Sequence, residues 1–167
     1  MLPESRPQRD QREDIHMPPQ WVESAATYLI TINCKKRGVP QLTQGEAPKL
    51  LFESVAYYHH AKKWWPEIIL LMPDHLHALI AFSWKDGRGM NGIIQDWKRY
   101  TSRTFSIEWQ RDWHDHRIRN QSDHADKWLY IANNPVRAGL VADYKDWPHV
   151  MVSGREGWQG PISERSG

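Results

Sequence analysis

Two short apolar runs, separated by only three residues, most strongly constrain how this chain can fold. The runs EIILLM at 67–72 and LHALIAF at 76–82 are rich in strand-forming residues, and the PDH between them suits a tight turn. They therefore predict an antiparallel hairpin. His75 and His77 stand at the start of the second strand. Because alternate residues of a strand share a face, both imidazoles should project from one side and Leu76 from the other.

This histidine pair has two interpretations. Two neutral imidazoles side by side can bind one divalent cation through their ring nitrogens. They can equally be hydrogen-bonded within a polar face of the sheet, and the His-Leu-His triplet alone does not separate the two cases. A third ligand and a reaction partner elsewhere in the chain would favour the metal site.

The remaining patterns predict an α+β protein. Apolar residues recur at helical spacing in three other segments, and TYLITIN alternates β-branched and aromatic residues as strands do. The predicted strands are 27–33, 67–72, 76–82 and 109–119. The predicted helices are 47–63, 90–105 and a third segment that begins at Ser122 and ends at Asn133. Ser122 is its expected N-cap, and Pro135 ends the helical pattern. This order matches the split βαββαβ layout of a ferredoxin-like domain. We expect an antiparallel sheet with helices on one face, plus a C-terminal helix that carries Tyr130.

Length and composition predict one domain with a tail at each end. The polar, charged and proline-containing segment 1–20 is expected to be a flexible arm, 21–153 the domain, and 154–167 a flexible tail. A single cysteine, Cys34, excludes an internal disulfide framework and favours a reducing cytoplasm. No apolar stretch approaches the ~20 residues that cross a bilayer, and the start lacks the apolar middle of a signal peptide. No membrane partner is therefore expected.

Charge and aromatic content are compatible with nucleic-acid binding. The 22 Lys and Arg residues barely exceed the 20 Asp and Glu residues, but basic side chains gather at 97–119 and in the KKR of 35–37. The chain also has 10 tryptophans, and aromatic side chains beside basic ones commonly bind single-stranded nucleic acid. The alternative is that most of these tryptophans pack in the core.

The segment WLYIANNPVRAGLV at 128–141 supplies two polar groups at helical spacing. Tyr130 and Asn134 are four residues apart, so a phenol and an amide on one helix can approach the same point. The apolar stripe of this helix is predicted to be Ala125, Trp128, Leu129 and Ala132, which leaves Tyr130 outside it. Taken alone, such a pair is also compatible with an ordinary helix surface.

Four motifs in order, MPDHLHALI, WKRYTSRTF, WQRDWHDHRIR and YIANNPVRAGLV, resemble the REP-associated tyrosine transposases, a branch of the single-tyrosine HUH transposases. The resemblance covers about 27–150. It implies that His75 and His77 bind a divalent metal, that Tyr130 is the nucleophile, and that Asn134 is the third metal ligand. Relatives that mobilise insertion sequences usually carry glutamine at the position of Asn134.

The resemblance implies a metal-dependent endonuclease and strand transferase. Such a protein would bind single-stranded or hairpin DNA of the repetitive extragenic palindrome (REP) type, and would cleave and rejoin it through a 5′-phosphotyrosine with Mg²⁺ or Mn²⁺. It would act at the nucleoid as a monomer or homodimer. No Gly-rich phosphate loop is present, so no nucleotide cofactor is expected. Two alternatives are a catalytically silent nucleic-acid-binding module of the same fold and a metal-dependent nuclease that uses water as its nucleophile.

Several basic and aromatic side chains are candidates for DNA contacts. For the basic residues the alternative is a solvated charged face, and for His116 it is a structural histidine or a residue that orients a metal ligand. The candidates are Lys98, Arg99, Arg103, Trp113, His116, Arg117, Arg119 and Arg137.

Overall fold

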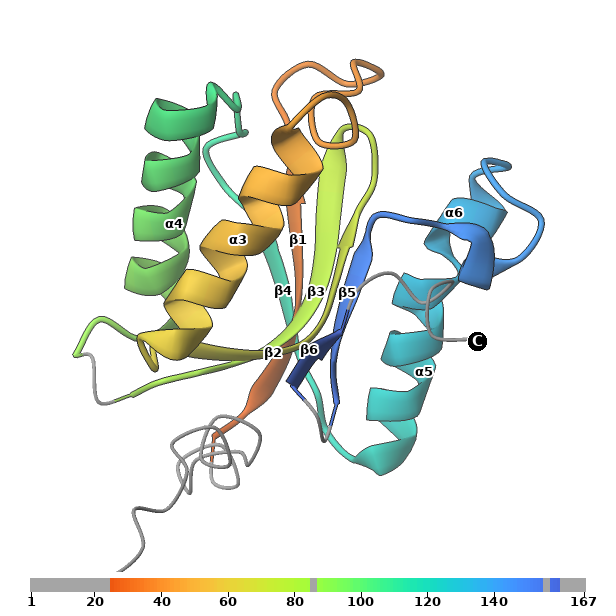
Figure 1. Cartoon of the computed structure of the whole chain (residues 1–167). Coiled ribbons are helices and arrows are strands. Elements are labelled where there is room, and N and C mark those ends of the chain that lie inside the picture. The colour runs from red at the N-terminus through yellow and green to blue at the C-terminus, as the bar shows by residue number, and fades with distance from the viewer. Residues whose placement is uncertain (1–24, 85–86, 155–156, 160–167) are drawn as a thin grey trace, which may run out of the picture.

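The structure, a computed structural model, describes residues 25–84, 87–154 and 157–159 (Figure 1). The predicted arm at 1–20 and residues 160–167 of the predicted tail lie outside these ranges. Within them, no helix has the length and apolar character that a bilayer crossing requires. The elements are β1 (Thr27–Asn33), α3 (Ala47–His60), β2 (Trp64–Leu71), β3 (His75–Phe82), α4 (Gly89–Phe105), β4 (His114–Arg117), α5 (Gln121–Ala132), α6 (Asn134–Arg137), the 3-10 turn η1 (Tyr144–Asp146), β5 (Val150–Gly154) and β6 (Gly157–Gln159).

The strands form one antiparallel sheet in the order β4-β1-β3-β2-β5-β6. The first four strands, with α3 and α4, follow the predicted order of elements, so the predicted α+β architecture is confirmed. The pairing of β5 with β2 was not predicted, and Ile68 lies opposite Val152 in that pair. Neither β5 nor β6 was predicted as a strand. β5 pairs with β2, which is far away in sequence, and such a pairing leaves little local signal.

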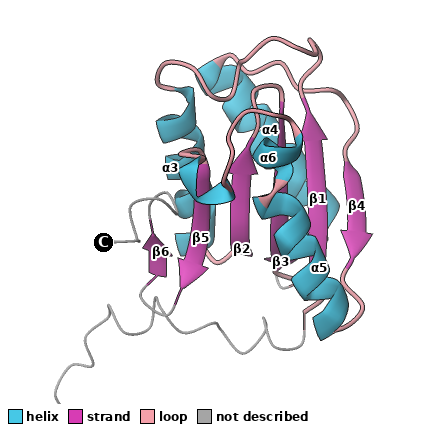
Figure 2. Cartoon of the chain, turned by 90° about the vertical axis from the view of Figure 1, so that its right-hand side faces the viewer, coloured by secondary structure: helices cyan, strands magenta, loops and turns pink. Residues whose placement is uncertain are grey.

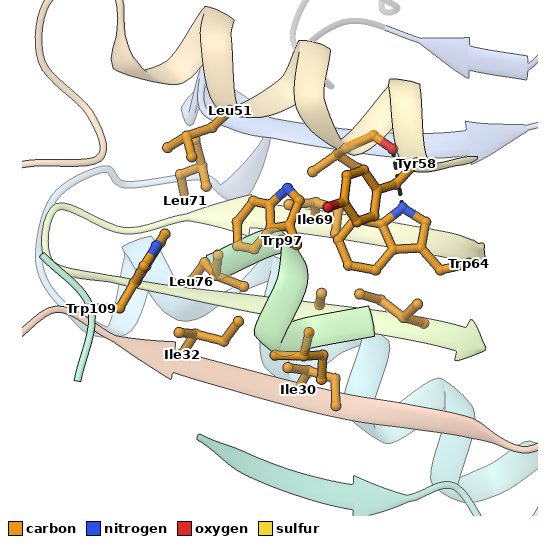
Figure 3. Close-up of a cluster of buried hydrophobic side chains, with 14 of the residues drawn as sticks. Ile30, Ile32, Leu51, Tyr58, Trp64, Ile69, Leu71, Leu76, Trp97 and Trp109 are labelled. Atoms are coloured by element: carbon orange, nitrogen blue, oxygen red, sulfur yellow. Dashed lines mark hydrogen bonds between the residues drawn. The ribbon is translucent and has the colours of Figure 1, made fainter. Parts of the chain in front are cut away.

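Helices cover both faces of this sheet. α3 and α4 lie on one face, and α5 and α6 lie on the other, in front of the strands in the side view (Figures 1 and 2). The larger core cluster lies between the sheet and α3 and α4, where Trp64, Trp97 and Trp109 are buried (Figure 3). A smaller cluster around Leu79 and Ile131 lies under α5. These tryptophans therefore belong to the core, as the alternative interpretation of their number proposed.

The faces of β3 follow the predicted alternation. Leu76 packs in the larger cluster, whereas Leu79 packs in the smaller one beneath α5. His75 and His77 are four and two residues from Leu79, and thus lie on the side of the sheet that α5 covers.

Two details of α5 differ from the sequence prediction. The N-cap is Asn120, whose side chain accepts a hydrogen bond of 2.9 Å from the backbone N–H of Asp123, so Ser122 does not cap the helix. Half of the predicted apolar stripe is confirmed: Trp128 packs against the smaller core cluster and Ala132 is buried, but Ala125 and Leu129 are exposed. Ile131, which was not in the predicted stripe, is fully buried. Ile131 packs into the smaller core cluster because of the orientation in which α5 lies on the sheet, and hydrophobic periodicity did not predict that orientation.

Candidate active site

The two imidazole rings of β3 lie beside each other. Their centroids are 4.9 Å apart and their planes are nearly perpendicular. In the pairing of β3 with β1, His75 lies opposite Asn33 and His77 lies opposite Thr31. The hairpin predicted from the two apolar runs thus places both rings on one face at the end of the strand.

Each ring uses its Nδ1 atom for a partner within the protein. Nδ1 of His75 is 2.8 Å from Oδ1 of Asp74, and Nδ1 of His77 is 2.8 Å from the hydroxyl of Thr31. Neither Nε2 atom has a hydrogen bond among the described residues. Nε2 is therefore the nitrogen that each ring can offer to a ligand.

His77 stays neutral in this environment. Its side chain is only 5% exposed. Burial, and then the charges of His75, Arg137 and Arg37, lower the pKa of His77 to about 3. A neutral imidazole keeps the lone pair that a metal ion requires.

Asp74 is held by three partners. Its Oδ2 accepts a hydrogen bond of 2.7 Å from the backbone N–H of Gly38, and its Oδ1 lies 3.4 Å from the guanidinium of Arg37 as well as next to His75. Burial alone would raise the pKa of Asp74, but these hydrogen bonds and the Arg37 charge outweigh it and lower that pKa. Asp74 is therefore ionised at neutral pH.

Tyr130 reaches this site from α5. The centroid of its ring is 5.7 Å from that of His77, and its side chain is 42% exposed. The guanidinium of Arg137 lies 4.1 Å from the ring centroid and also donates a 2.9 Å hydrogen bond to the carbonyl of Tyr130. The fold thus brings an exposed phenol beside the histidine pair, and Arg137 contacts both its ring and its backbone carbonyl.

Asn134 lies just beyond the end of this helix. α5 stops at Ala132, and Pro135 cannot donate the hydrogen bond that would continue it, so Asn134 begins the separate short helix α6. Its side chain is half-buried and has no hydrogen bond among the described residues. Tyr130 and Asn134 are therefore not held in one continuous helix, and the role of Asn134 as third ligand stays a prediction.

The donor set around the histidines fits a cation only if it includes an amide or a ligand from outside the chain. Within the described ranges there is no cluster of three or more His, Cys, Asp and Glu side chains that could hold a metal ion. Two imidazoles and one amide oxygen, as proposed for His75, His77 and Asn134, leave coordination positions for oxygen atoms of a substrate or water.

The candidate DNA-contact residues divide between the two sides of the sheet. Arg137 lies at the site, whereas Arg99 and Arg103 are exposed on α4, on the opposite face (Figure 1). Arg117 and Arg119 are exposed at the end of β4 and just after it. His116 on β4 lies 3.2 Å from a carboxylate oxygen of Asp123 at the start of α5.

Lys98 has a structural role in this fold. It is only 8% exposed, and its ammonium donates hydrogen bonds of 2.7 Å to the carbonyls of Gln110 and Arg111. The same ammonium lies 5.0 Å from the ring centroid of Trp113, which packs against the larger core cluster. These contacts leave Lys98 little freedom to meet a phosphate, contrary to the sequence expectation, and the same packing restricts Trp113.

Sequence reasoning missed three residues of this site. Asp74 stands directly before His75 in the motif, and Arg37 ends the KKR cluster, so both were visible but not assigned to the site. Thr31 gave no signal, because its contact with His77 depends on the pairing of β1 with β3.

No protein-family model matches the chain. Two curated proteins are similar to it. One is a protein of Haemophilus influenzae that is provisionally named as a REP-associated tyrosine transposase. It is 31% identical over an alignment of 96 positions, which covers 48% of this chain and 54% of that protein. The other is the REP-associated tyrosine transposase of Escherichia coli, 24% identical over 127 residues, which are 73% of each chain. The match thus spans about half the length of the Haemophilus protein.

A solved structure of a REP-associated tyrosine transposase bound to a REP hairpin has the same fold. The TM-score is 0.66 at 22% identity, over 75% of this chain and 76% of that one. The fold comparison and the two curated relatives agree with the resemblance that the four motifs indicated.

Proposed function

Because this chain is a homologue of REP-associated tyrosine transposases, we propose that it binds single-stranded or hairpin DNA of the REP type and cleaves and rejoins it through Tyr130. The proposed intermediate is a 5′-phosphotyrosine. The reaction would use a divalent cation, Mg²⁺ or Mn²⁺, held by His75, His77 and Asn134.

One observation carries this proposal: an exposed phenol on α5 lies against a pair of imidazoles on β3. Tyrosines on a helix that packs over a sheet usually either join the core or face solvent. Tyr130 is exposed to solvent, yet its ring also contacts His77 and Arg137. A nucleophile must combine these two properties, because it has to be oriented and also reach its substrate.

The chemistry conserves the energy of the phosphodiester. The phenol oxygen of Tyr130 would attack phosphorus and lose its proton, the bond from phosphorus to the 3′ oxygen would break, and that oxygen would leave as a 3′-hydroxyl. Rejoining reverses the exchange, because a 3′-hydroxyl attacks the phosphotyrosine. A cation at the histidine pair would polarise the phosphate oxygens and offset the developing negative charge.

Charge at the site supports a phosphodiester substrate. The guanidinium groups of Arg37 and Arg137 both act on His77 in the direction that disfavours its protonation, so both lie close enough to give the site a positive potential. Asp74, whose carboxylate is occupied by its own partners, is the anion next to the histidines. We propose that these two arginines meet the DNA backbone at the reacting strand, and that Arg117, Arg119 and His116 meet it further along.

The test is covalent capture. Labelled REP-type hairpin DNA and an unstructured strand of equal length are incubated with the protein and Mn²⁺, and denaturing gels are examined for a protein–DNA adduct. We expect an adduct with the hairpin, its loss in Tyr130→Phe, and its retention in Tyr57→Phe, a matched change at an exposed tyrosine of α3 on the other face of the sheet.

The other outcomes identify the alternatives. Cleavage that persists in Tyr130→Phe without an adduct would show that water is the nucleophile. Hairpin binding by the wild-type chain with neither cleavage nor adduct would show a silent binding module. Either result contradicts the proposed reaction.

A further inference from the structure

We propose that Asp74 and Thr31 are positioning residues for the histidine pair: Asp74 fixes His75 in the tautomer whose Nε2 is offered to a cation, and Thr31 orients the ring of His77 through its Nδ1 atom. The inference rests on the metal site of the proposed function and adds to it the residues that orient the ligands. Neither residue touches the reacting atoms in this proposal. Each acts through the imidazole beside it.

The contact between Asp74 and His75 sets the first tautomer. An ionised carboxylate can only accept hydrogen bonds, so Oδ1 of Asp74, 2.8 Å from Nδ1 of His75, requires a proton on that nitrogen. In the neutral ring the lone pair is then on Nε2. Metal-binding histidines commonly have a carboxylate, carbonyl or water on the other ring nitrogen for this reason.

Asp74 can exert this control because it is itself fixed. Gly38 holds Oδ2 through its backbone N–H, and Arg37 lies beside Oδ1. Arg37 also donates to the carbonyl of Asp74 at 3.1 Å and to the amide oxygen of Asn33 at 2.9 Å. Arg37 and Gly38, in the segment that follows β1, therefore hold the carboxylate of Asp74 in place. His75, the first residue of β3, comes directly after Asp74.

Thr31 has the same position relative to the second ring. It lies opposite His77 in the pairing of β1 with β3, and its hydroxyl is 2.8 Å from Nδ1 of His77. A hydroxyl can accept or donate, so it does not impose a tautomer by itself. The hydroxyl nevertheless lies within hydrogen-bond distance of Nδ1. When Nε2 binds a cation, the proton of the ring is on Nδ1, and the hydroxyl then accepts a hydrogen bond from that N–H.

The first test needs no metal and no DNA. Nitrogen NMR of the histidine rings, recorded with a chelator at pH 8, reports which nitrogen carries the proton. We expect the Nδ1–H form at His75 in the wild-type chain and mixed tautomers at His75 in Asp74→Asn. Thr31→Ser, which keeps the hydroxyl beside His77, should leave the spectrum of His75 unchanged. A wild-type ring at His75 with its proton on Nε2 would overturn the inference.

The second test measures the cation directly. Calorimetric titration with Mn²⁺ should show affinity roughly 10- to 100-fold weaker in Asp74→Asn and in Thr31→Val, the usual effect of removing such partners. Valine keeps the β-branched shape of Thr31 in the strand. Glu53→Gln, which removes an exposed carboxylate on α3 at the opposite face, should bind Mn²⁺ as the wild type does.

The two tests separate the possible failures. Wild-type Mn²⁺ affinity in both Asp74→Asn and Thr31→Val would overturn the positioning roles and leave the proposed function intact. A wild-type chain that binds no Mn²⁺ would overturn the metal site and this inference together. Unfolding midpoints equal to that of the wild type show that a change in affinity does not come from partial unfolding.

Discussion

The side chain that most directly holds Tyr130 is that of Arg137. Its guanidinium lies over the phenol ring, and one of its nitrogens donates to the carbonyl of the same tyrosine. A planar guanidinium can make both contacts at once, which a lysine ammonium does less well. Arg137 thus constrains the ring and the backbone of Tyr130, and it adds positive charge beside the histidines.

We predict that Arg137→Lys slows formation of the DNA adduct roughly two- to fivefold, because it weakens the contact of the cation with the phenol ring by about 0.5–1 kcal/mol at an exposed site while keeping the charge. Single-turnover rates at saturating DNA measure this step apart from binding. Arg111→Lys, a matched change at an exposed arginine outside the site, should keep the wild-type rate. An unchanged rate in Arg137→Lys would show that Arg137 does not orient Tyr130.

Sequence was sufficient to single out the residues that carry the candidate chemistry, but not those that support them. His75, His77 and Tyr130 belong to quoted motifs, and the fold brings their rings into contact. Thr31 is different, because its role follows from which residue of β1 lies opposite His77. Strand register is a property of the assembled sheet, and local sequence specifies it only weakly.

At the scale of elements, α5 shows where local patterns are reliable and where they are not. The helix and its end before Pro135 were predicted, because proline breaks helices for a local steric reason. The buried side of the helix was predicted only in part: Ala132 is buried as expected, but Leu129 is 51% exposed and Ile131 is buried. Which apolar residues face inward depends on the angle at which the helix meets the sheet, and this orientation also turns Tyr130 toward His77.

The start of α5 provides a stability prediction. We expect Asn120→Ala to lower the free energy of unfolding by about 1 kcal/mol, because the side chain of Asn120 caps the backbone N–H of Asp123. Urea denaturation measures the change. Asn120→Ser should retain most of the stability, and Ser122→Ala should be close to neutral, since Ser122 is exposed and is not the cap. A larger loss for Ser122→Ala than for Asn120→Ala would contradict this assignment of the cap.

In the whole molecule, the sheet separates the main core from the candidate site. The cluster with Trp64, Trp97 and Trp109 lies under α3 and α4, and the histidine pair faces α5 (Figures 1 and 3). Buried indole N–H groups on the core side have partners, as in the 2.9 Å bond from Trp97 to the hydroxyl of Ser54. The core can therefore support β3 from one side while the other side carries the histidine pair beside Tyr130.

Acid should destabilise the whole fold. His59 is buried next to Trp65, and His149 packs against Trp147. Burial is the main cause that lowers the pKa of each below the ordinary value of 6.5. As the pH falls through about 6.5, these histidines take up protons in the unfolded chain before they do so in the folded one. The unfolded state then binds more protons, so the free energy of unfolding must fall as the pH falls.

The measurement is urea denaturation at pH 8.0, 6.5 and 5.0 with a chelator present, which keeps metal binding out of the comparison. We expect stability to be highest at pH 8.0 and to decline steadily toward pH 5.0. The double variant His59→Gln and His149→Gln should show a shallower decline, whatever its stability at pH 8.0, because glutamine does not titrate. A decline as steep as that of the wild type would mean that another group, above all His77, whose pKa is lowered to about 3 in the fold, dominates the acid response.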